Sequence, residues 1–352
     1  MKDKESTDST RGRKKKKDKE TTAEPAEGDG GFNKKKKTKK VIRVVCLSDT
    51  HCLHETVDVP DGDLLIHCGD FTTRGPLSQT EEFNAWLGRL PHRHKVVVCG
   101  NHEAALYPMH EDPTKIQAVL SNACYLQDSA VTFTWSELKG KNDSSNGRRR
   151  KRRKKRPHDP PSSSSDDAAA ERENEEEEEE EEEEDRITIY GSPWIGRKRI
   201  FLLPKLGYFY TKVGSMGLSF ALPSNSPALH EKWGRVPRGN AIDFLVTHQP
   251  PQTVLDGYRG RAMGCPALLQ AVREEVRPKV HVFGHVHDAH GVEERHGITF
   301  VNAANYLERA RRATVFEYDV GKRRVLRVIR SAAEEDEEER VKAKGEGEAS
   351  SS

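Results

Sequence analysis

A block of charge in the middle of the chain constrains the fold more than any other feature of the sequence. It begins with the basic run Arg148–Arg156, continues through serines, and ends in an unbroken run of glutamates, Glu175–Glu184. Such a segment cannot bury enough apolar surface to offset the conformational entropy that ordering would cost, so we expect residues 140–185 to be disordered. Because the entropy of closing a loop grows only logarithmically with its length, a folded domain can carry this segment as an insertion.

The two ends of the chain have a similar character. Residues 1–40 are rich in lysine and nearly free of large apolar side chains, and residues 333–352 are mainly acidic. The opposite charges nearly cancel, so the net charge is only +2 although 33% of the residues are charged. We predict a disordered basic tail over 1–40, a single domain over 41–332 that the 140–185 insertion interrupts, and a disordered acidic tail over 333–352. The residues left for the domain are enough for one large core.

Targeting signals and cysteine usage bear on where the protein works. The sequence has no apolar run of membrane-spanning length and no apolar stretch of a secretory signal, so we expect neither a membrane partner nor secretion. Its cysteines form no CxxC pair, which is typical of reduced thiols in the cytoplasm or nucleus. The basic runs match nuclear-localisation or polyanion-binding patches, with nucleic acid as a partner, although a solvated flank is the simpler interpretation.

Short apolar runs rich in β-branched residues predict buried strands. The clearest are residues 41–49, 63–70, 95–101, 241–248 and 279–285. Helical patterns fall between them, at 78–90 and 266–276, and this alternation favours an α/β fold. A second set at 131–135, 186–194, 298–303, 313–320 and 323–330 has fewer helices between its members and indicates a second, partly antiparallel sheet. We expect a four-layer α/β/β/α sandwich, with two mixed sheets face to face and helices outside.

Two local signals suggest where these helices begin. Ser78 is followed three residues later by Glu81, the spacing of a capping box. Pro266 stands where a first helical residue is expected, because proline lacks the N–H that this position leaves unpaired.

The predicted strands end in residues that bind metals. In open α/β sheets, ligands gather outside the carboxyl ends of the strands. The candidates at these ends are Asp49, His51, Asp70, Asn101, His248, His285 and His287, with His102 next to Asn101. Oxygen and imidazole ligands together suit Mn, Fe or Zn better than Ca or Mg alone. The seven candidates are too many for one tetrahedral ion and suit two ions that share a carboxylate, an arrangement used most often to hydrolyse phosphate esters.

The blocks "SDTH", "CGDF", "CGNHE", "VTHQPP" and "FGHVH", in this order, resemble the signature of the calcineurin-like metallophosphoesterases. Further stretches, among them "LLIHCGDFT", "YGSPW" and "VNAAN", are similar to the branch of the brain-expressed metallophosphoesterase-domain proteins, which is related to class III cyclic-nucleotide phosphodiesterases. The resemblance covers the expected domain and leaves out the tails and the insertion. It implies the four-layer metallophosphoesterase fold.

The resemblance also implies roles for the residues in these blocks. One metal would be held by Asp49, His51 and His287, and the other by Asn101, His248 and His285. Asp70 would bridge the two metals, and a hydroxide shared between them would be the nucleophile. His102 would face the substrate, where it could stabilise the transition state or protonate the leaving oxygen. His285 is lost in some less active relatives, so its presence here favours an active enzyme.

Four further residues lie near the predicted ligands in the sequence or at a strand end, and their roles are open. Thr73 replaces an aspartate that orients the catalytic histidine in the protein-phosphatase branch, whereas Arg74 keeps the position that contacts phosphate there and could clamp it. Glu103 could help to position the local turn. Trp194 could form a substrate-facing wall for a base or an aromatic ring, or it could simply pack.

These features lead to one main hypothesis of function and two alternatives. The main one is a metal-dependent phosphoesterase that hydrolyses small phosphodiesters, with cyclic nucleotides as one candidate class. A nuclease of the same superfamily is the alternative that the basic runs encourage. A binding or scaffold protein that has kept the fold without catalysis is the alternative from another class, and the intact ligand blocks argue against it.

Overall fold

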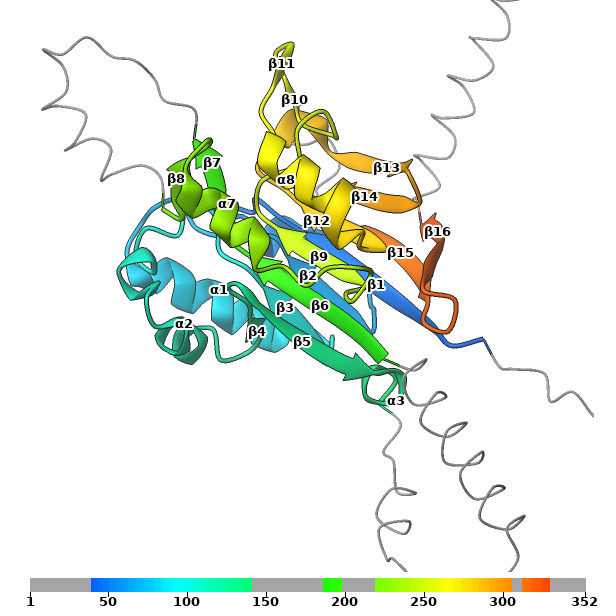
Figure 1. Cartoon of the computed structure of the whole chain (residues 1–352). Coiled ribbons are helices and arrows are strands. Elements are labelled where there is room, and N and C mark those ends of the chain that lie inside the picture. Colours follow the sequence, from blue (N-terminus) through cyan, green and yellow to red (C-terminus); the bar gives the residue numbers. More distant parts are fainter. Residues whose placement is uncertain (1–38, 141–185, 198–218, 306–311, 330–352) are drawn as a thin grey trace, which may run out of the picture. The chain divides into compact units, whose positions relative to one another are not determined.

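The computed structural model describes residues 39–140, 186–197, 219–305 and 312–329 (Figure 1). The predicted tails and the predicted insertion lie outside these residues, apart from Lys39, Lys40 and Gly140 at their borders.

The first sheet has the strand order β16-β15-β1-β2-β3-β4. Strands β1 to β4 run parallel, and β15 runs antiparallel to both of its neighbours. The strands are β1 (Val41–Leu47), β2 (Leu64–His67), β3 (His94–Val97), β4 (Cys124–Tyr125), β15 (Thr314–Asp319) and β16 (Arg324–Ile329).

The second sheet has the strand order β13-β14-β12-β9-β6-β5. Its four central strands are parallel, and both edge strands are antiparallel to their neighbours. The strands are β13 (Gly291–Arg295), β14 (Ile298–Asn302), β12 (Val280–Phe283), β9 (Phe244–Thr247), β6 (Arg186–Ser192) and β5 (Ser129–Thr134).

The predicted division of strands between the sheets is therefore wrong, although both sheets are mixed as expected. Strands β9 and β12 lie in the second sheet with β5, β6 and β14, while β15 and β16 join the first. The helix content between strands does not reveal which strands pair. Here β1 pairs with a strand from the far end of the chain, Val41 opposite Asp319.

Side-chain alternation along the strands creates the layers. In β1, Ile42, Val44 and Cys46 belong to a buried cluster that includes side chains of both sheets, such as Ile189 and Val246. Because successive side chains of a strand point to opposite faces, the intervening residues of β1 face away from the second sheet. The alternation therefore produces a core between the two sheets and leaves an apolar outer face on each.

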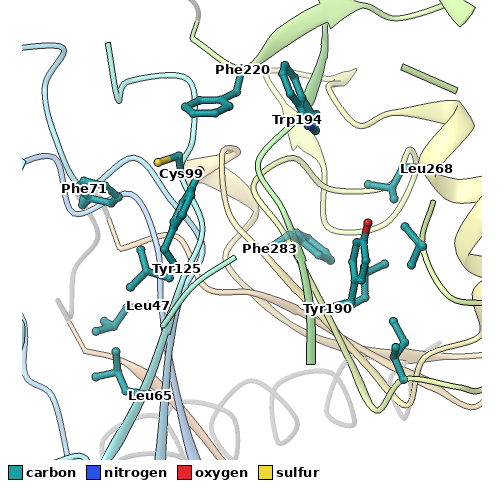
Figure 2. Close-up of a cluster of buried hydrophobic side chains, with 14 of the residues drawn as sticks. Leu47, Leu65, Phe71, Cys99, Tyr125, Tyr190, Trp194, Phe220, Leu268 and Phe283 are labelled. Atoms are coloured by element: carbon teal, nitrogen blue, oxygen red, sulfur yellow. The ribbon is translucent and has the colours of Figure 1, made fainter. Parts of the chain in front are cut away.

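Helices cover these outer faces. Helices α1 (Leu77–Arg89) and α2 (Pro113–Val119) lie on the first sheet, and α7 (Pro227–Gly234) and α8 (Pro266–Gln270) on the second (Figure 1). Figure 2 shows Leu47 and Leu65 of the first sheet well apart from Tyr190 and Phe283 of the second, where Leu268 of α8 also packs. The expected four-layer α/β/β/α sandwich is confirmed.

The starts of the helices agree only partly with the sequence signals. Helix α1 begins at Leu77 after the N-cap residue Pro76, so Ser78 lies inside the helix and the expected capping box is wrong. The side-chain oxygen of Gln79 instead accepts hydrogen bonds from the backbone N–H groups of Thr73 and Gly75, at 3.0 and 3.1 Å. Pro266 is the first residue of α8, as predicted.

The remaining elements are short. Helix α8 continues as a π-helical segment, η4 (Ala271–Val276), and α3 (Trp135–Leu138) follows β5. Two small two-stranded sheets lie outside the main sheets: β7 (Ile195–Arg197) with β8 (Ala221–Pro223), and β10 (Gly257–Tyr258) with β11 (Arg261–Ala262). Short 3-10 helices are η1 (His54–Thr56), η2 (Tyr107–Met109) and η5 (His287–Ala289). In the described ranges, every helix falls short of the length and apolar character that crossing a membrane requires.

Candidate metal centre

The loops after β1 and β2 hold three of the predicted ligands in a shared framework. Asp49, His51 and Asp70 all have positive φ angles, 56°, 41° and 54°. Such conformations are uncommon for residues other than glycine, and persist only where the surroundings hold them. Here the backbone N–H of Asp49 donates to the carbonyl oxygen of Gly69 at 2.9 Å, and that of His51 donates to Asp70 at 3.0 Å. The two loops are thereby fixed to each other.

The loops after β9 and β12 bring three more predicted ligands to the same place. The backbone N–H of His285 donates to the Asp49 carboxylate at 2.8 Å, and His287 Nε2 lies 3.2 Å from the other oxygen of that carboxylate. Gly284 is required for this approach, because a Cβ at this position would overlap the side chains of Ser48 and Asp49. The positive φ of this turn belongs to His285 rather than to the glycine.

Three groups of potential ligand atoms result, and each spans no more than 4.8 Å. They are Asp49 with His51 and His287, Asp70 with His248 and His285, and His51 with Asp70 and His102. Asn101 joins the second group, because its Oδ1 lies 3.1 Å from Nε2 of His248. The structure thus brings together all seven residues that the sequence proposes as ligands, and Asp70 lies between the groups that contain His51 and His248.

The separations between these atoms fit shared cations. His51 Nε2 and His287 Nε2 are 3.4 Å apart, and His248 Nε2 is 3.2 Å from both Asp70 Oδ2 and His285 Nδ1. Ligands bound at about 2.0–2.1 Å to one tetrahedral ion lie about 3.3 Å from each other. The residues present therefore fit metal binding.

Hydrogen bonds behind the site orient two of the imidazoles for this role. Nδ1 of His248 lies 2.8 Å from the carbonyl oxygen of Cys68, and Nδ1 of His51 lies 3.0 Å from that of Thr72. A carbonyl oxygen only accepts, so each Nδ1 carries a proton, and Nε2 is the ring nitrogen that faces the cluster and can bind a metal once it is deprotonated. Metal-binding histidines are oriented by the same kind of contact.

Charges within the site depend strongly on one another. Burial opposes ionisation of Asp70, but the charge and hydrogen bond of His248, together with the charges of His102 and His51, outweigh it and lower the pKa of this carboxyl. Burial likewise opposes protonation of His248, while Asp70 raises the pKa of this imidazole to about 9. Burial, followed by the charge of His248, lowers the pKa of His285 to about 4. The buried carboxylates thus attract positive charge that the crowded imidazoles cannot all carry, and a metal cation would supply it.

His102 lies at the edge of this cluster. Its backbone N–H donates to Asp70 Oδ1 at 2.8 Å, its Nε2 is 3.9 Å from Asp70 Oδ2, and its side chain is 24% exposed. Burial is the main reason that its pKa falls to about 4. Its Nδ1 is buried and has no hydrogen-bond partner in the described part of the chain.

Glu103 has a larger part in the site than the sequence indicates. Its buried carboxylate accepts hydrogen bonds from the backbone N–H groups of Asp70 at 3.0 Å, Thr72 at 3.0 Å and Gly100 at 2.5 Å. It therefore ties the loop that carries Asp70 to the loop that carries Asn101. The signal available in the sequence was its place directly after His102 at a predicted strand end.

The two predicted substrate-binding residues differ in their surroundings. Arg74 is exposed, and its charge is one of the smaller influences that lower the pKa of His102. Trp194 is only 4% exposed, its indole N–H donates to Asp128 at 2.8 Å, and the Lys232 ammonium lies 4.2 Å from its ring centroid. These contacts support packing for Trp194 rather than a substrate-facing wall.

Comparison with known proteins finds several that are similar to most of this chain. Residues 42–289 match the calcineurin-like phosphoesterase family. Metallophosphoesterase domain-containing protein 1 of Homo sapiens is 32% identical over 284 residues, which cover 74% of this chain but only 65% of the human protein. A UPF0046 protein of Caenorhabditis elegans is 33% identical over 282 residues, 75% of each chain. The crystal structure of TT1561 of Thermus thermophilus has a TM-score of 0.43 at 10% identity, over 81% of this chain and 97% of that chain.

The family match and the site coincide. The matched range contains all the predicted ligands, from Asp49 to His287. Clusters of imidazole and carboxylate groups at one edge of two sheets fit a metal-dependent phosphoesterase. On these grounds the chain belongs to the calcineurin-like phosphoesterase family, in the branch of the metallophosphoesterase domain-containing proteins.

Proposed function

We propose that this protein is a phosphodiesterase that uses two metal ions to hydrolyse small phosphodiesters, with cyclic nucleotides as one candidate class. The observation that carries the proposal is a pair of adjoining ligand groups, Asp49 with His51 and His287 and Asp70 with His248 and His285, because ligand atoms of His51 and Asp70 also lie within 4.8 Å of each other. Two adjoining groups of this kind suit two neighbouring ions better than one.

The proposed ligands divide as the sequence blocks suggest. Asp49, His51 and His287 would hold one ion, while Asn101, His248 and His285 would hold the other, and Asp70 lies where it could contact both. The mixture of carboxylate, amide and imidazole groups suits Mn, Fe or Zn. Bound metals in such sites polarise phosphoryl oxygens and lower the pKa of bound water toward about 7.

The chain's own residues would position the substrate and move a proton. His102 is partly exposed, and its Nε2 lies 3.9 Å from the Asp70 carboxylate, so this ring nitrogen faces the cluster. With a pKa of about 4 this imidazole is mainly neutral near pH 7, so it could stabilise charge on the phosphoryl group in the transition state through a ring N–H. To donate a proton to the leaving oxygen of a diester, its pKa would first have to rise beside the bound phosphate. Arg74, which is exposed, could bind a phosphate oxygen through its fork of N–H groups.

The first test separates metal binding from turnover. His102→Ala should keep the metal and lose most of the activity, because none of its ring atoms is needed in the seven-residue ligand set. Asp70→Asn should lose both metal and activity. His230→Ala is the matched control, since this histidine is exposed on α7. An Asp70→Asn protein that is fully loaded and active would exclude the bridging role.

The second test identifies the substrate class. The full chain, loaded with Mn, Fe or Zn in turn, would be assayed against bis-p-nitrophenyl phosphate, 2′,3′- and 3′,5′-cyclic nucleotides, and single-stranded DNA. We expect turnover of the small diesters. Turnover confined to DNA would favour a nuclease, and bound metal without turnover of any of these compounds would favour a scaffold role.

A further inference from the structure

A basic cavity lies at the amino-terminal ends of the parallel strands of the second sheet, opposite to the candidate metal centre at their carboxyl ends. Its volume is about 400 Å³, and its lining includes Asn240, Arg273, Arg277, Lys279 and His296. These residues precede the parallel strands β9, β12 and β14, whereas the proposed ligands follow β9 and β12. Lys279 and His285 lie six positions apart across β12, which corresponds to about 20 Å in a strand. The cavity is therefore separate from the metal centre.

The charges around this cavity are unbalanced. Arg273, Arg277 and Lys279 carry fixed positive charges, and His296 adds an imidazole. Over the ranges that the structure describes, none of these four side chains forms an ion pair. The neighbouring carboxylate of Glu275 is already paired with Arg238 at 2.9 Å. Uncompensated cations around a concave surface raise the local concentration of anions.

The walls of the cavity are held in place by the backbone. The N–H groups of Gly239 and Asn240 donate to the carbonyl oxygens of Glu275 and Val276 at the end of η4, at 2.9 and 3.1 Å. The N–H of Lys279 donates to the carbonyl oxygen of Asp243 at 3.0 Å. The cationic side chains therefore project from segments tied to the sheet and to each other.

Arg277 occupies a position where glycine would be expected. It follows η4 with a φ of 51° and a ψ of 56°, the left-handed conformation that usually ends a helix at glycine. Its Nε donates to the carbonyl oxygen of Arg273, 3.4 Å away, and leaves the terminal N–H groups of the guanidinium for another partner. Arginine is less stable than glycine in this backbone conformation, but it places a guanidinium group at the cavity.

We propose that this cavity is a second anion site, which binds the phosphate groups of a small phosphorylated molecule. Guanidinium groups match the oxygens of phosphate in pairs, and an ammonium beside them adds a point charge. The volume lies in the range of small-molecule sites and exceeds what a single phosphate would fill, so a ligand with more than one phosphate, or with a phosphate and a small organic group, fits it best.

The test uses inorganic pyrophosphate as the probe and the full chain at physiological salt. Hydrogen exchange, followed by mass spectrometry, reports protection separately for peptides 271–279 and 293–299 at the cavity and for peptides at the metal centre. Binding of the probe to basic runs elsewhere in the chain does not protect the cavity peptides. We expect saturable protection of these peptides, with a short glutamate peptide giving none at the same concentration.

Two variants remove the charge without disturbing the backbone. Arg277→Gly keeps a residue that adopts the left-handed conformation freely, and Lys279→Gln keeps the backbone hydrogen bonds of this position. Each should weaken the protection of the cavity peptides by about ten-fold, equivalent to about 1.4 kcal/mol. The matched control is Lys115→Gln on α2, which removes one positive charge on the first sheet and should change the affinity by less than about two-fold.

Turnover of the diester reporter should be the same in all three variants. The proposal fails if both cavity variants titrate like the unchanged chain, if the probe never protects the cavity peptides, or if the glutamate peptide protects them equally. Because neither residue belongs to the metal centre, a failure of this proposal leaves the proposed phosphodiesterase activity untouched.

Discussion

Replacing Glu103 by glutamine should weaken both the fold and the metal centre. The substitution keeps the size of the side chain but replaces one carboxylate oxygen by an NH₂ group. That carboxylate accepts from three backbone N–H groups, those of Asp70, Thr72 and Gly100, and from the hydroxyl of Thr72 at 3.2 Å. A glutamine side chain has only one oxygen that can accept these hydrogen bonds. Its NH₂ group would face the N–H groups that the other carboxylate oxygen binds, and donors cannot pair with donors.

The size of the effect follows from these contacts. Each buried donor left unpaired costs about 1–3 kcal/mol, and the substitution leaves one or two of them. An opposing contribution exists, because burial and the nearby Asp70 raise the pKa of Glu103 to about 7, so that the native charge is itself unfavourable. We expect a net loss of about 2 kcal/mol in the free energy of unfolding, which in a domain of this size lowers Tm by about 4–8 °C.

The effect on the metal centre should exceed the effect on stability. Residues that orient metal ligands typically change metal affinity or activity by about 10–100-fold when replaced, and Glu103 fixes the backbone of Asp70 and of Gly100 beside Asn101. Thermal unfolding, metal titration and kcat/KM on the diester reporter would be measured for Glu103→Gln. Glu137→Gln is the matched control, because this exposed glutamate accepts a backbone N–H at the start of α3, far from the ligand clusters.

The control should lower stability by no more than about 1 kcal/mol and leave metal affinity and turnover unchanged. If Glu103→Gln behaves like the control in all three measurements, the role assigned to this carboxylate is wrong.

Three further predictions concern other parts of the molecule. Gly284→Ala should abolish metal retention, because the added Cβ overlaps the side chains of Ser48 and Asp49. The control is Gly234→Ala in α7, where the added Cβ meets open space, and it should leave stability unchanged or raise it by about 0.5–1 kcal/mol. Metal analysis and thermal unfolding of both variants check this prediction. Tyr318→Phe should cost about 1–2 kcal/mol in urea unfolding, since its hydroxyl donates to the buried Asp243 at 2.8 Å, and an unchanged midpoint would contradict this. Burial lowers the pKa of His281 to about 3, so below pH 6.5 the unfolded chain takes up a proton that the folded chain does not. The free energy of unfolding therefore decreases as the pH is lowered. At pH 5 this histidine should cost about 2 kcal/mol, and His281→Leu should flatten the slope of the unfolding free energy between pH 6.5 and 5; an equal slope would refute the assignment.

The proposed ligands of the candidate site could be identified from the sequence because each one stands within four residues of the end of β1, β2, β3, β9 or β12. An apolar β-branched run predicts a buried strand, and the polar residue that ends it must lie at the sheet edge. Asp49 after β1, His248 after β9 and His285 after β12 all follow this rule. The gathering of these residues depends on strands running in the same direction, which the alternation with helices already suggests. It also depends on how the two sheets pack, because β1 to β3 lie in one sheet and β9 and β12 in the other.

The environments of single side chains could not be predicted in this way. The sequence places Trp194 at a strand end, and only the structure shows its indole N–H bound to Asp128 and its ring under Lys232. Glu103 reads as a turn residue, and only the structure shows three N–H groups from two loops converging on it. Both depend on segments that are distant in sequence, such as Trp194 and Asp128.

The sequence by itself determined most of the segments that form strands in the two main sheets, although not β4 and β13, and which polar residues lie at the candidate site. The tertiary structure decided which strands pair, so that β15 lies beside β1 and both β9 and β12 join the second sheet. It also decided which carboxylates hold the site together and where the cationic cavity forms. The hydrophobic periodicity that predicts a strand is present in the local sequence. Strand pairing depends instead on the free energy of packing between distant segments, and that free energy is a property of the whole fold.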